Sequence, residues 1–166
     1  KHFYKSIDDV CKKYKVIQYF IDANSNDGTL EFLSSKKANV IQQLHSGRGG
    51  AILSGFELVK SDAYIVYSPD GNEDIRDLPK FLKFLHEGYD LVIASRMMKE
   101  SFNEEDDNIF KLRKWVNNIF NFFANFFFNK SKNYVTDSIN GFRAVTKKTI
   151  STIKLDAYDY TIEYQM

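Results

Sequence analysis

The stretch from Ala63 to Arg96 constrains the fold of this chain more than any other part of the sequence. It opens with an apolar run, Ala63 to Tyr67, that is typical of a buried strand. Proline and glycine end this strand in a turn at residues 68–72. Apolar residues then recur at helical spacing between 78 and 85, and a second apolar run at 91–94 predicts another strand. The order strand, acidic turn, helix and strand indicates an α/β fold.

The acidic turn in this stretch predicts a ligand site. In a parallel α/β sheet, ligands bind beyond the carboxyl ends of the strands, and Asp70 and Asn72 follow such an end. A carboxylate in this position can hold a metal ion against a phosphate group. We therefore predict that Asp70 is a metal ligand.

Other segments extend the pattern of helices and strands. We expect helices at residues 2–14, 30–37, 51–60 and 147–153, strands at residues 16–21 and 39–44, and a polar turn that runs into a strand between 137 and 145. The alternation up to Arg96 predicts a mostly parallel sheet with right-handed crossovers, flanked by helices.

The composition limits the classes of protein to consider. A chain of 166 residues fits one domain over residues 1–166, and a formal net charge of +1 argues against a basic face for nucleic acid. The single cysteine, Cys11, excludes an internal disulfide and a multi-cysteine zinc site. The sequence opens on helix-like, charged residues and stops within TIEYQM, so we expect the domain to be incomplete at both ends.

Two polar loops are further candidates for ligand binding. Asp22 ends the first predicted strand, where a base or a ribose could be read, and the loop that follows it is rich in acceptors and exposed amides. The glycines at residues 46–50 precede a helix, so a phosphate could approach its backbone amides, and Arg48 adds a positive charge. The alternative in both places is a turn without a ligand, with Asp27 or Thr29 capping the helix after the first loop.

The segment 110–128 predicts an amphipathic aromatic helix. It begins with basic residues and Trp115, it is rich in phenylalanine, and its asparagines form a narrow polar stripe. A basic start followed by aromatic residues suits a helix lying in a membrane interface, which we favour over a helix buried against the domain or a partner. The acidic run at residues 104–107 predicts an exposed loop.

Four segments resemble, in the same order, motifs of the family 2 glycosyltransferases of the GT-A fold. Segment 21–29, IDANSNDGT, resembles a nucleotide loop often written V-D-D-G-S-x-D-G-T, and segment 46–72 resembles a G-x-G-x-A…Y-I-V-x-D-A-D-x-Q stretch. Segment 77–96 resembles D-x-P-x-L…G-Y-D-x-V-x-G-S-R, and segment 137–148 resembles D-x-x-S-G-F-R-A. The group that this chain resembles most is the dolichol- and polyprenyl-phosphate sugar synthases.

The resemblance implies roles for individual residues. Those that it places at the nucleotide-sugar are Asp22, Asn24, Ser25, Arg48, Asp70 and Arg96, with Asp70 also holding Mg²⁺ or Mn²⁺. Those that it places near the sugar, the acceptor phosphate or the membrane are Asp137, Arg143, Arg113, Lys114 and Trp115, and it gives Asp70, Asp137 and Arg143 catalytic roles.

The chain also departs from the family pattern. Ser68 stands where the first aspartate of D-x-D is usual, Ala23 replaces the second aspartate of the nucleotide loop, and Asn140 replaces a common serine. The usual first strand, which ends in P-x-x-N-E, is absent before Lys1. These departures imply weaker metal binding and an incomplete base pocket.

The resemblance implies an inverting transfer of a sugar from a UDP- or GDP-linked donor to a polyprenyl phosphate, by a protein bound peripherally at the cytoplasmic face of a membrane. One alternative is transfer to a glycan, for which Asp137 would be the general base. Another is a catalytically weak partner subunit with the same fold. A Rossmann dehydrogenase is disfavoured, because its glycine loop should follow the first strand directly.

Overall fold

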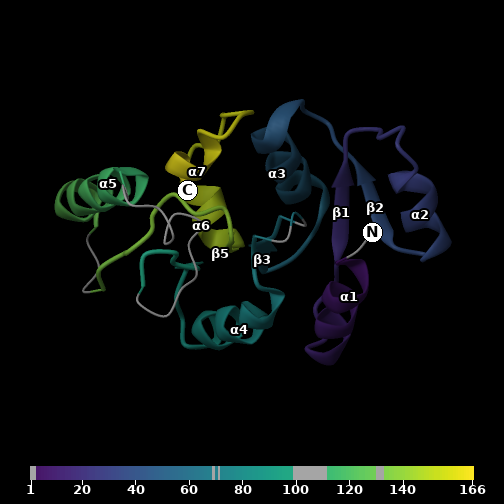
Figure 1. Cartoon of the computed structure of the whole chain (residues 1–166), viewed down its shortest axis with the longest axis horizontal. Helices are drawn as coiled ribbons and strands as arrows, with labels where there is room; N and C mark the ends of the chain where they lie inside the picture. The colour runs from purple at the N-terminus through teal and green to yellow at the C-terminus, as the bar shows by residue number, and fades with distance from the viewer. Residues whose placement is uncertain (1–2, 69, 71, 99–111, 130–132) are drawn as a thin grey trace.

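The computed structural model describes residues 3–68, 70, 72–98, 112–129 and 133–166. The helices are α1 (Tyr4–Lys13), α2 (Thr29–Ser35), α3 (Gly47–Leu58), α4 (Leu78–His86), α5 (Leu112–Phe128), α6 (Lys147–Thr152) and α7 (Ile162–Gln165), with a short 3₁₀ helix η1 (Ile75–Asp77) before α4. The strands are β1 (Tyr19–Asp22), β2 (Asn39–Gln42), β3 (Ala63–Val66), β4 (Leu91–Ile93) and β5 (Arg143–Thr146). Their arrangement is shown in Figure 1.

The strands form two sheets, and the predicted α/β class is confirmed. β1 and β2 pair in parallel, with Tyr19 opposite Asn39. β5 lies between β3 and β4 and runs antiparallel to both, an arrangement that the sequence analysis did not predict. Arg143 is opposite Val66 on one side and Ile93 on the other, so the carboxyl ends of β3 and β4 meet at the start of β5. This edge of the sheet carries most of the candidate site.

The core lies where α1 and α4 pack on the three-stranded sheet. Phe81 of α4 is 3% exposed, and its ring centroid is 4.6 Å from that of Phe142, just before β5. Ile7 and Cys11 of α1 form a second buried cluster with Leu78. Each large apolar side chain buried in this way contributes about 1.5–3 kcal/mol. Cys11 is therefore a core residue, and the same burial raises the pKa of its thiol.

Between the two sheets lies a cavity of about 840 Å³. Within the described residues, β1 and β3 are edge strands, and residues of both line this cavity together with apolar side chains of α3 and α4. An additional strand in this position could pair with both edges. That a first strand is missing from the sequence stays a prediction.

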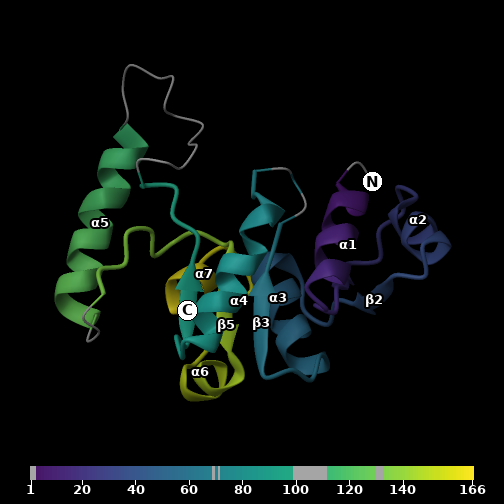
Figure 2. The ribbon, with the colours of Figure 1, turned by 90° about the horizontal axis from the view of Figure 1, so that it is seen from below.

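The helix predicted at 110–128 is α5, which stands at one end of the molecule (Figure 2). Residues 110 and 111 and the acidic run at 104–107 lie outside the described residues. In the described part of the chain, no helix combines the length and the hydropathy needed to cross a bilayer.

Candidate active site

The first part of the site is the acidic turn that follows β3. Asp70 is exposed; its Oδ1 accepts a hydrogen bond from the Asn72 N–H (3.0 Å), and its Oδ2 accepts one from the Ser68 hydroxyl (3.3 Å). Among the described residues, no three carboxylate, histidine or cysteine side chains gather into a metal site. Mg²⁺ is often held by one or two carboxylates together with substrate phosphates, and Asp70 fits that type of site. Its role as a metal ligand stays a prediction.

Glu73 belongs to the same turn, although the sequence analysis did not single it out. The half-buried carboxylate accepts a hydrogen bond from the Ser68 N–H (2.6 Å). Burial raises the pKa of Glu73 from 4.5 to about 7, against the lowering effect of this hydrogen bond. Near neutral pH, the carboxyl is therefore divided between its two forms. Its position three residues after Asp70, at a strand end, was the available signal.

Arg48, near the start of α3, lies beside the acidic turn. Its Nε donates to Glu163 Oε1 (3.0 Å), and its Nη1 lies 3.5 Å from the Ser68 hydroxyl. The guanidinium also lies over the Tyr160 ring, 5.7 Å from its centroid. Arg48 therefore lies beside the acidic turn, and its predicted contact with a nucleotide-sugar stays a prediction. Glu163 follows no recognisable motif, so sequence reasoning gave it no role in the site.

The glycines lie in the first turn of α3, which begins at Gly47 rather than at residue 51 as predicted, and this turn packs against the C-terminal segment. Gly47 has φ +83°, in the left-handed region that favours glycine. A Cβ on Gly49 would collide with the backbone of residues 157–159, and the Gly50 N–H donates to the Tyr158 carbonyl (3.1 Å). Close packing of two backbones therefore accounts for the glycines. This matches the alternative without a ligand rather than a phosphate site on these amides.

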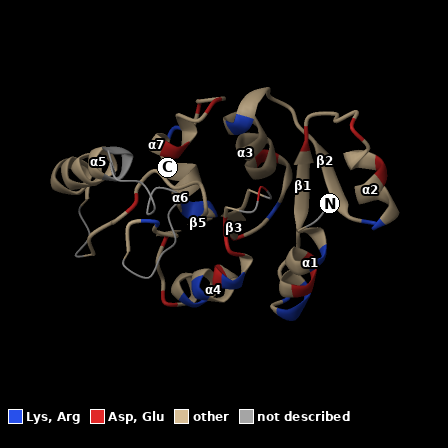
Figure 3. Ribbon diagram, viewed as in Figure 1, with Lys and Arg blue, Asp and Glu red and all other residues tan. Residues whose placement is uncertain are grey.

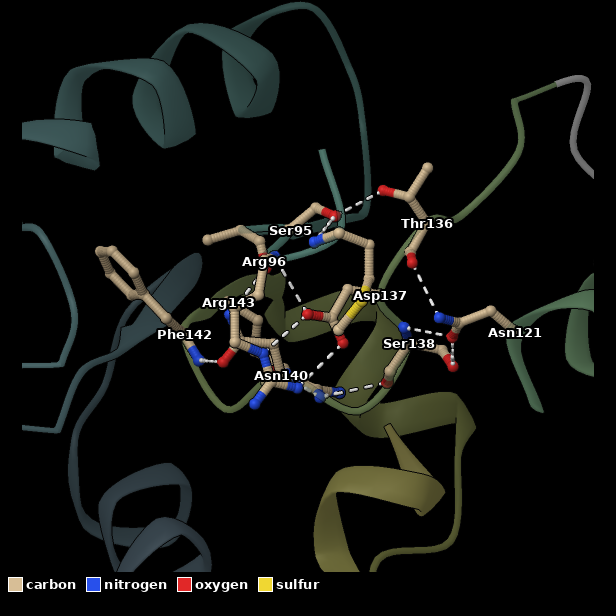
Figure 4. Close-up of polar contacts among 11 residues, drawn as sticks. Ser95, Arg96, Asn121, Thr136, Asp137, Ser138, Asn140, Phe142 and Arg143 are labelled. Carbon is tan, nitrogen blue, oxygen red and sulfur yellow. Dashed lines mark hydrogen bonds and ion pairs between the residues drawn. The ribbon is translucent and has the colours of Figure 1, made fainter. Parts of the chain in front are cut away.

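The second part of the site is an ion pair between Asp137 and Arg96 (Figure 4). Asp137 Oδ2 accepts hydrogen bonds from the Arg96 N–H (3.1 Å) and Nε (2.8 Å), and Oδ1 accepts one from Nη2 (3.1 Å). The Asp137 side chain is fully buried, whereas that of Arg96 is 42% exposed. The carboxylate therefore orients a guanidinium that is partly exposed to solvent.

Arg143 is the first residue of β5, the central strand, and lies between the acidic turn and the Asp137–Arg96 ion pair. Its side chain is fully buried. Its Nε and Nη2 donate to the Asn140 carbonyl (2.9 and 2.6 Å), Nη1 donates to the Glu163 carbonyl (3.1 Å), and Nη2 also donates to the Ser138 carbonyl (3.3 Å). Burial lowers the pKa of Arg143 to about 10, so the side chain stays charged at neutral pH. In this structure it organises the loop before β5, and its predicted contact with an acceptor phosphate stays a prediction.

The predicted nucleotide loop follows β1. Asp22 accepts hydrogen bonds from the Ser25 N–H (2.7 Å) and hydroxyl (2.8 Å), and Asn24 has φ +68°. These bonds give the loop a defined shape. Within the described residues, no hydrogen bond or ion pair joins this loop to Arg48, Asp70 or the rest of the site. Their predicted contacts with a base or a ribose stay predictions.

The two parts of the site form one polar network. It runs from Asp70 through Ser68 and Arg48 to Glu163. From the Glu163 backbone it continues through Arg143 to the Ser138 carbonyl, next to Asp137. The structure thus brings together five of the eleven predicted site residues near the carboxyl ends of β3 and β4: Arg48, Asp70, Arg96, Asp137 and Arg143.

Helix α5 carries the residues predicted for the membrane. Trp115 is 62% exposed, whereas the side chains of Arg113 and Lys114 lie outside the described residues. From Trp115 to Phe128 the helix has no charged residue (Figure 3). Its exposed apolar side chains are Trp115, Val116, Ile119, Phe120, Phe122, Phe123, Phe126, Phe127 and Phe128. We call these nine residues the aromatic face.

The chain is similar in sequence to known proteins. The family model described as Glycosyl transferase family 2 matches residues 3–149. The uncharacterised protein MJ1222 of Methanocaldococcus jannaschii is 35% identical over 176 residues, which cover 96% of this chain and 69% of that protein. The undecaprenyl-phosphate 4-deoxy-4-formamido-L-arabinose transferase of Aeromonas hydrophila is 29% identical over 100 residues, which cover 56% of this chain and 30% of that enzyme.

A solved structure shares the fold. The glucosyl-3-phosphoglycerate synthase of Mycobacterium tuberculosis, in complex with Mn²⁺ and UDP-glucose, matches with a TM-score of 0.68 and 18% identity. The match covers 96% of this chain and 56% of that one, so the chain spans little more than half of the solved protein.

Proposed function

The chain belongs to glycosyl transferase family 2, and from this premise we propose that it transfers a sugar, with inversion, from a UDP- or GDP-linked donor to a polyprenyl phosphate. We place the reaction at the cytoplasmic face of a membrane, with this part of the protein bound peripherally. One observation carries the proposal: the polar network runs from the exposed Asp70 to Ser138, which is hydrogen-bonded to Asn121 of α5. A donor at one end and a lipid surface at the other would therefore share one site.

The donor diphosphate belongs at the acidic turn. Asp70 offers exposed carboxylate oxygens and would hold Mg²⁺ or Mn²⁺ there, which would neutralise charge on the leaving diphosphate. The Mn²⁺ and UDP-glucose in the mycobacterial synthase support this assignment by analogy of fold. Arg48, beside Ser68, supplies a further positive charge close to the turn. Asp22, Asn24 and Ser25 are proposed to contact the nucleoside.

The burial and the hydrogen bonds of the Asp137 carboxylate favour a phosphate acceptor over a sugar hydroxyl. A hydroxyl acceptor needs a carboxylate that is free to take its proton. Both oxygens of Asp137 instead accept hydrogen bonds from Arg96, and the side chain is buried. A phosphate acceptor is already anionic and needs only to be held in place by cations. Arg143 and the basic start of α5 are the candidates for that task.

The relatives give the lipid acceptor some support. The name of the Aeromonas enzyme includes undecaprenyl phosphate, and its similarity covers just over half of this chain. The exposed aromatic face of α5 provides a surface that suits the interface of a bilayer.

A transfer assay tests the proposal. The protein would be incubated with labelled UDP- and GDP-sugars, Mn²⁺ and polyprenyl phosphate in vesicles, and the label would be measured in the organic and aqueous phases. We expect label in the organic phase. Asp70→Asn should lower the transfer rate on the order of 100-fold, because the metal ion that would neutralise the charge on the leaving diphosphate loses its carboxylate ligand. Asp9→Asn, an exposed carboxylate on α1, is the matched control and should retain full transfer.

The outcome separates the candidate functions. Label only in water-soluble product would identify a glycan acceptor and overturn the lipid assignment. No product with either nucleotide, from a folded sample, would overturn the proposed activity and favour a partner subunit that retains the fold.

A further inference from the structure

Helix α5 directs its polar residues toward the protein and its apolar residues toward solvent. Asn121 is 1% exposed, whereas Phe126 on the same helix is 71% exposed. Figures 1 and 2 show α5 at one end of the molecule, beside the chain that leads back to β5. A surface helix normally buries its apolar stripe, so this orientation requires a specific polar attachment.

Asn121 provides that attachment with both ends of its amide. Its Nδ2 donates to the Thr136 carbonyl (2.7 Å), and its Oδ1 accepts from the Ser138 N–H (2.9 Å) and hydroxyl (2.6 Å). One turn later, Asn125 Nδ2 donates to the Val135 carbonyl (2.7 Å) and Oδ1 accepts from the Val135 N–H (2.8 Å). The two asparagines therefore hold the backbone on both sides of Asp137.

Residues 136 and 137 of this segment also form hydrogen bonds with the residues that follow β4. The Thr136 hydroxyl donates to the Ser95 hydroxyl oxygen (2.7 Å), and the buried Asp137 accepts the three bonds from Arg96. Figure 4 shows Asp137 between Asn121 and Arg96. A shift of α5 that carries Asn121 with it therefore moves the carboxylate that orients Arg96.

The charges around α5 indicate what covers its aromatic face. Residues 108–136 contain five Lys or Arg residues and no Asp or Glu, and the acidic run at 104–107 precedes them in the sequence. A second copy of this helix would bring like charges together, whereas anionic lipid headgroups complement them. An aromatic helix flanked by cations is typical of binding to an anionic lipid surface.

We propose that Asn121 is a positioning residue that couples the seating of α5 on an anionic lipid surface to the position of Asp137 beside Arg96. The catalytic meaning of this coupling rests on the proposed function, whereas the coupling itself rests on the contacts above. A lipid surface that binds α5 in its docked position stabilises that position by mass action. The segment held by Asn121 is then stabilised with it, and the coupling is reciprocal.

The single tryptophan, Trp115, makes the first step measurable, because it lies on the aromatic face. Phosphatidylcholine vesicles with and without phosphatidylglycerol would be added to the protein, and Trp115 fluorescence and amide hydrogen exchange would be recorded. We expect the anionic vesicles to shift the Trp115 emission to shorter wavelength. We also expect them to slow exchange of the Ser138 amide by about tenfold, within the usual range of coupling between sites.

Three variants isolate the role of Asn121. In Asn121→Ala, we expect the Trp115 shift to remain while the vesicle response of the Ser138 amide disappears. Ser138→Ala removes only the hydroxyl bond to Asn121 and should weaken the response, which keeps the test valid if Asn121→Ala fails to fold. Asn118→Ala, at an exposed asparagine on the same helix, is the matched control and should respond like the wild type.

Kinetics give a second readout. In the wild type, anionic vesicles should lower the KM for the nucleotide-sugar, because Arg96 is then held in place. Asn121→Ala should lose that vesicle dependence, which a residue that only stabilises the fold would not alter.

The outcomes separate this inference from the proposed function. Absence of transfer in the wild type would refute the proposed function, while the Ser138 exchange test still decides the coupling. The coupling is overturned if the wild-type Ser138 amide does not respond to anionic vesicles, if Asn121→Ala responds equally, or if neutral vesicles act as strongly as anionic ones.

Discussion

Helices α4 and α5 are both amphipathic, but they present opposite faces to the protein. In α4, Leu78 and Phe81 are 2% and 3% exposed and pack into the core, while Lys80 lies at the surface. In α5 the buried residue is Asn121, and Phe126 is in solvent. The surface that each helix meets explains the difference. α4 meets apolar side chains near β5, whereas α5 meets backbone groups that need hydrogen-bond partners.

The largest expected effect compares two phenylalanines. Phe81→Ala should lower the free energy of unfolding by about 3–5 kcal/mol, because it leaves a cavity against Phe142. Phe126→Ala, on the aromatic face, should change it by no more than about 0.5 kcal/mol. Urea unfolding of both variants measures the difference. Equal losses would show that the aromatic face is buried in solution.

The second prediction concerns what the aromatic face binds. Phe126→Ser should weaken binding to anionic vesicles by about 1.5–3 kcal/mol, roughly tenfold or more, because one large apolar side chain no longer enters the interface. Phe84→Ser, at a partly exposed position on α4, is the matched control and should bind as the wild type does. Vesicle sedimentation measures both, and unchanged binding of Phe126→Ser would argue against membrane contact through this face.

The third prediction uses Glu73, in the turn that leads to α4. Its folded pKa, about 7, lies above the ordinary value of 4.5, so the stability associated with the protonated form is complete below about pH 4.5 and lost as pH rises through about 7. Allowing for partial solvent screening, we expect a loss of about 1–3 kcal/mol over this window. In Glu73→Gln, the free energy of unfolding should no longer fall over this pH range. Urea unfolding at a series of pH values measures this. An identical slope in both proteins would contradict the assignment.

The smallest expected effect lies on the outer face of α4. Lys83 is exposed, and its Nζ is 3.8 Å from Glu87 Oε1. Lys83→Ala should change the free energy of unfolding by less than about 0.5 kcal/mol, because water screens such pairs. Thermal unfolding measures this change. A loss as large as that of Phe81→Ala would show that the two faces of α4 have been assigned wrongly.

Local pattern predicted most of the elements. The apolar run at 63–67 became β3, at 63–66, and the helical spacing at 78–85 became α4, because each pattern reports which residues meet a core. The predicted helix at 110–128 is confirmed over 112–128. The antiparallel direction of β5 could not be predicted, since strand polarity depends on how the chain returns from α5.

Less of the site could be predicted, because its contacts join segments far apart in the sequence. Asp137 was identified from a motif, but its pairing with Arg96 depends on tertiary structure. Gly49 was considered for phosphate binding, whereas its close contact is with the backbone of residues 157–159. The polar stripe of α5 was recognised, but amphipathic spacing does not show which face turns inward. The backbone groups on either side of Asp137 find their hydrogen-bond partner in Asn121, which explains why this residue is the buried one.

The most direct test of the donor site is a calorimetric titration of UDP, GDP and their sugar conjugates into the protein, with and without Mn²⁺, beside Asp70→Ala. We predict binding of one nucleotide that depends on Mn²⁺ and is lost in Asp70→Ala, while Asp9→Ala binds as the wild type does. Absence of binding to a folded sample, or binding that neither Mn²⁺ nor Asp70→Ala changes, would contradict a donor site at the acidic turn.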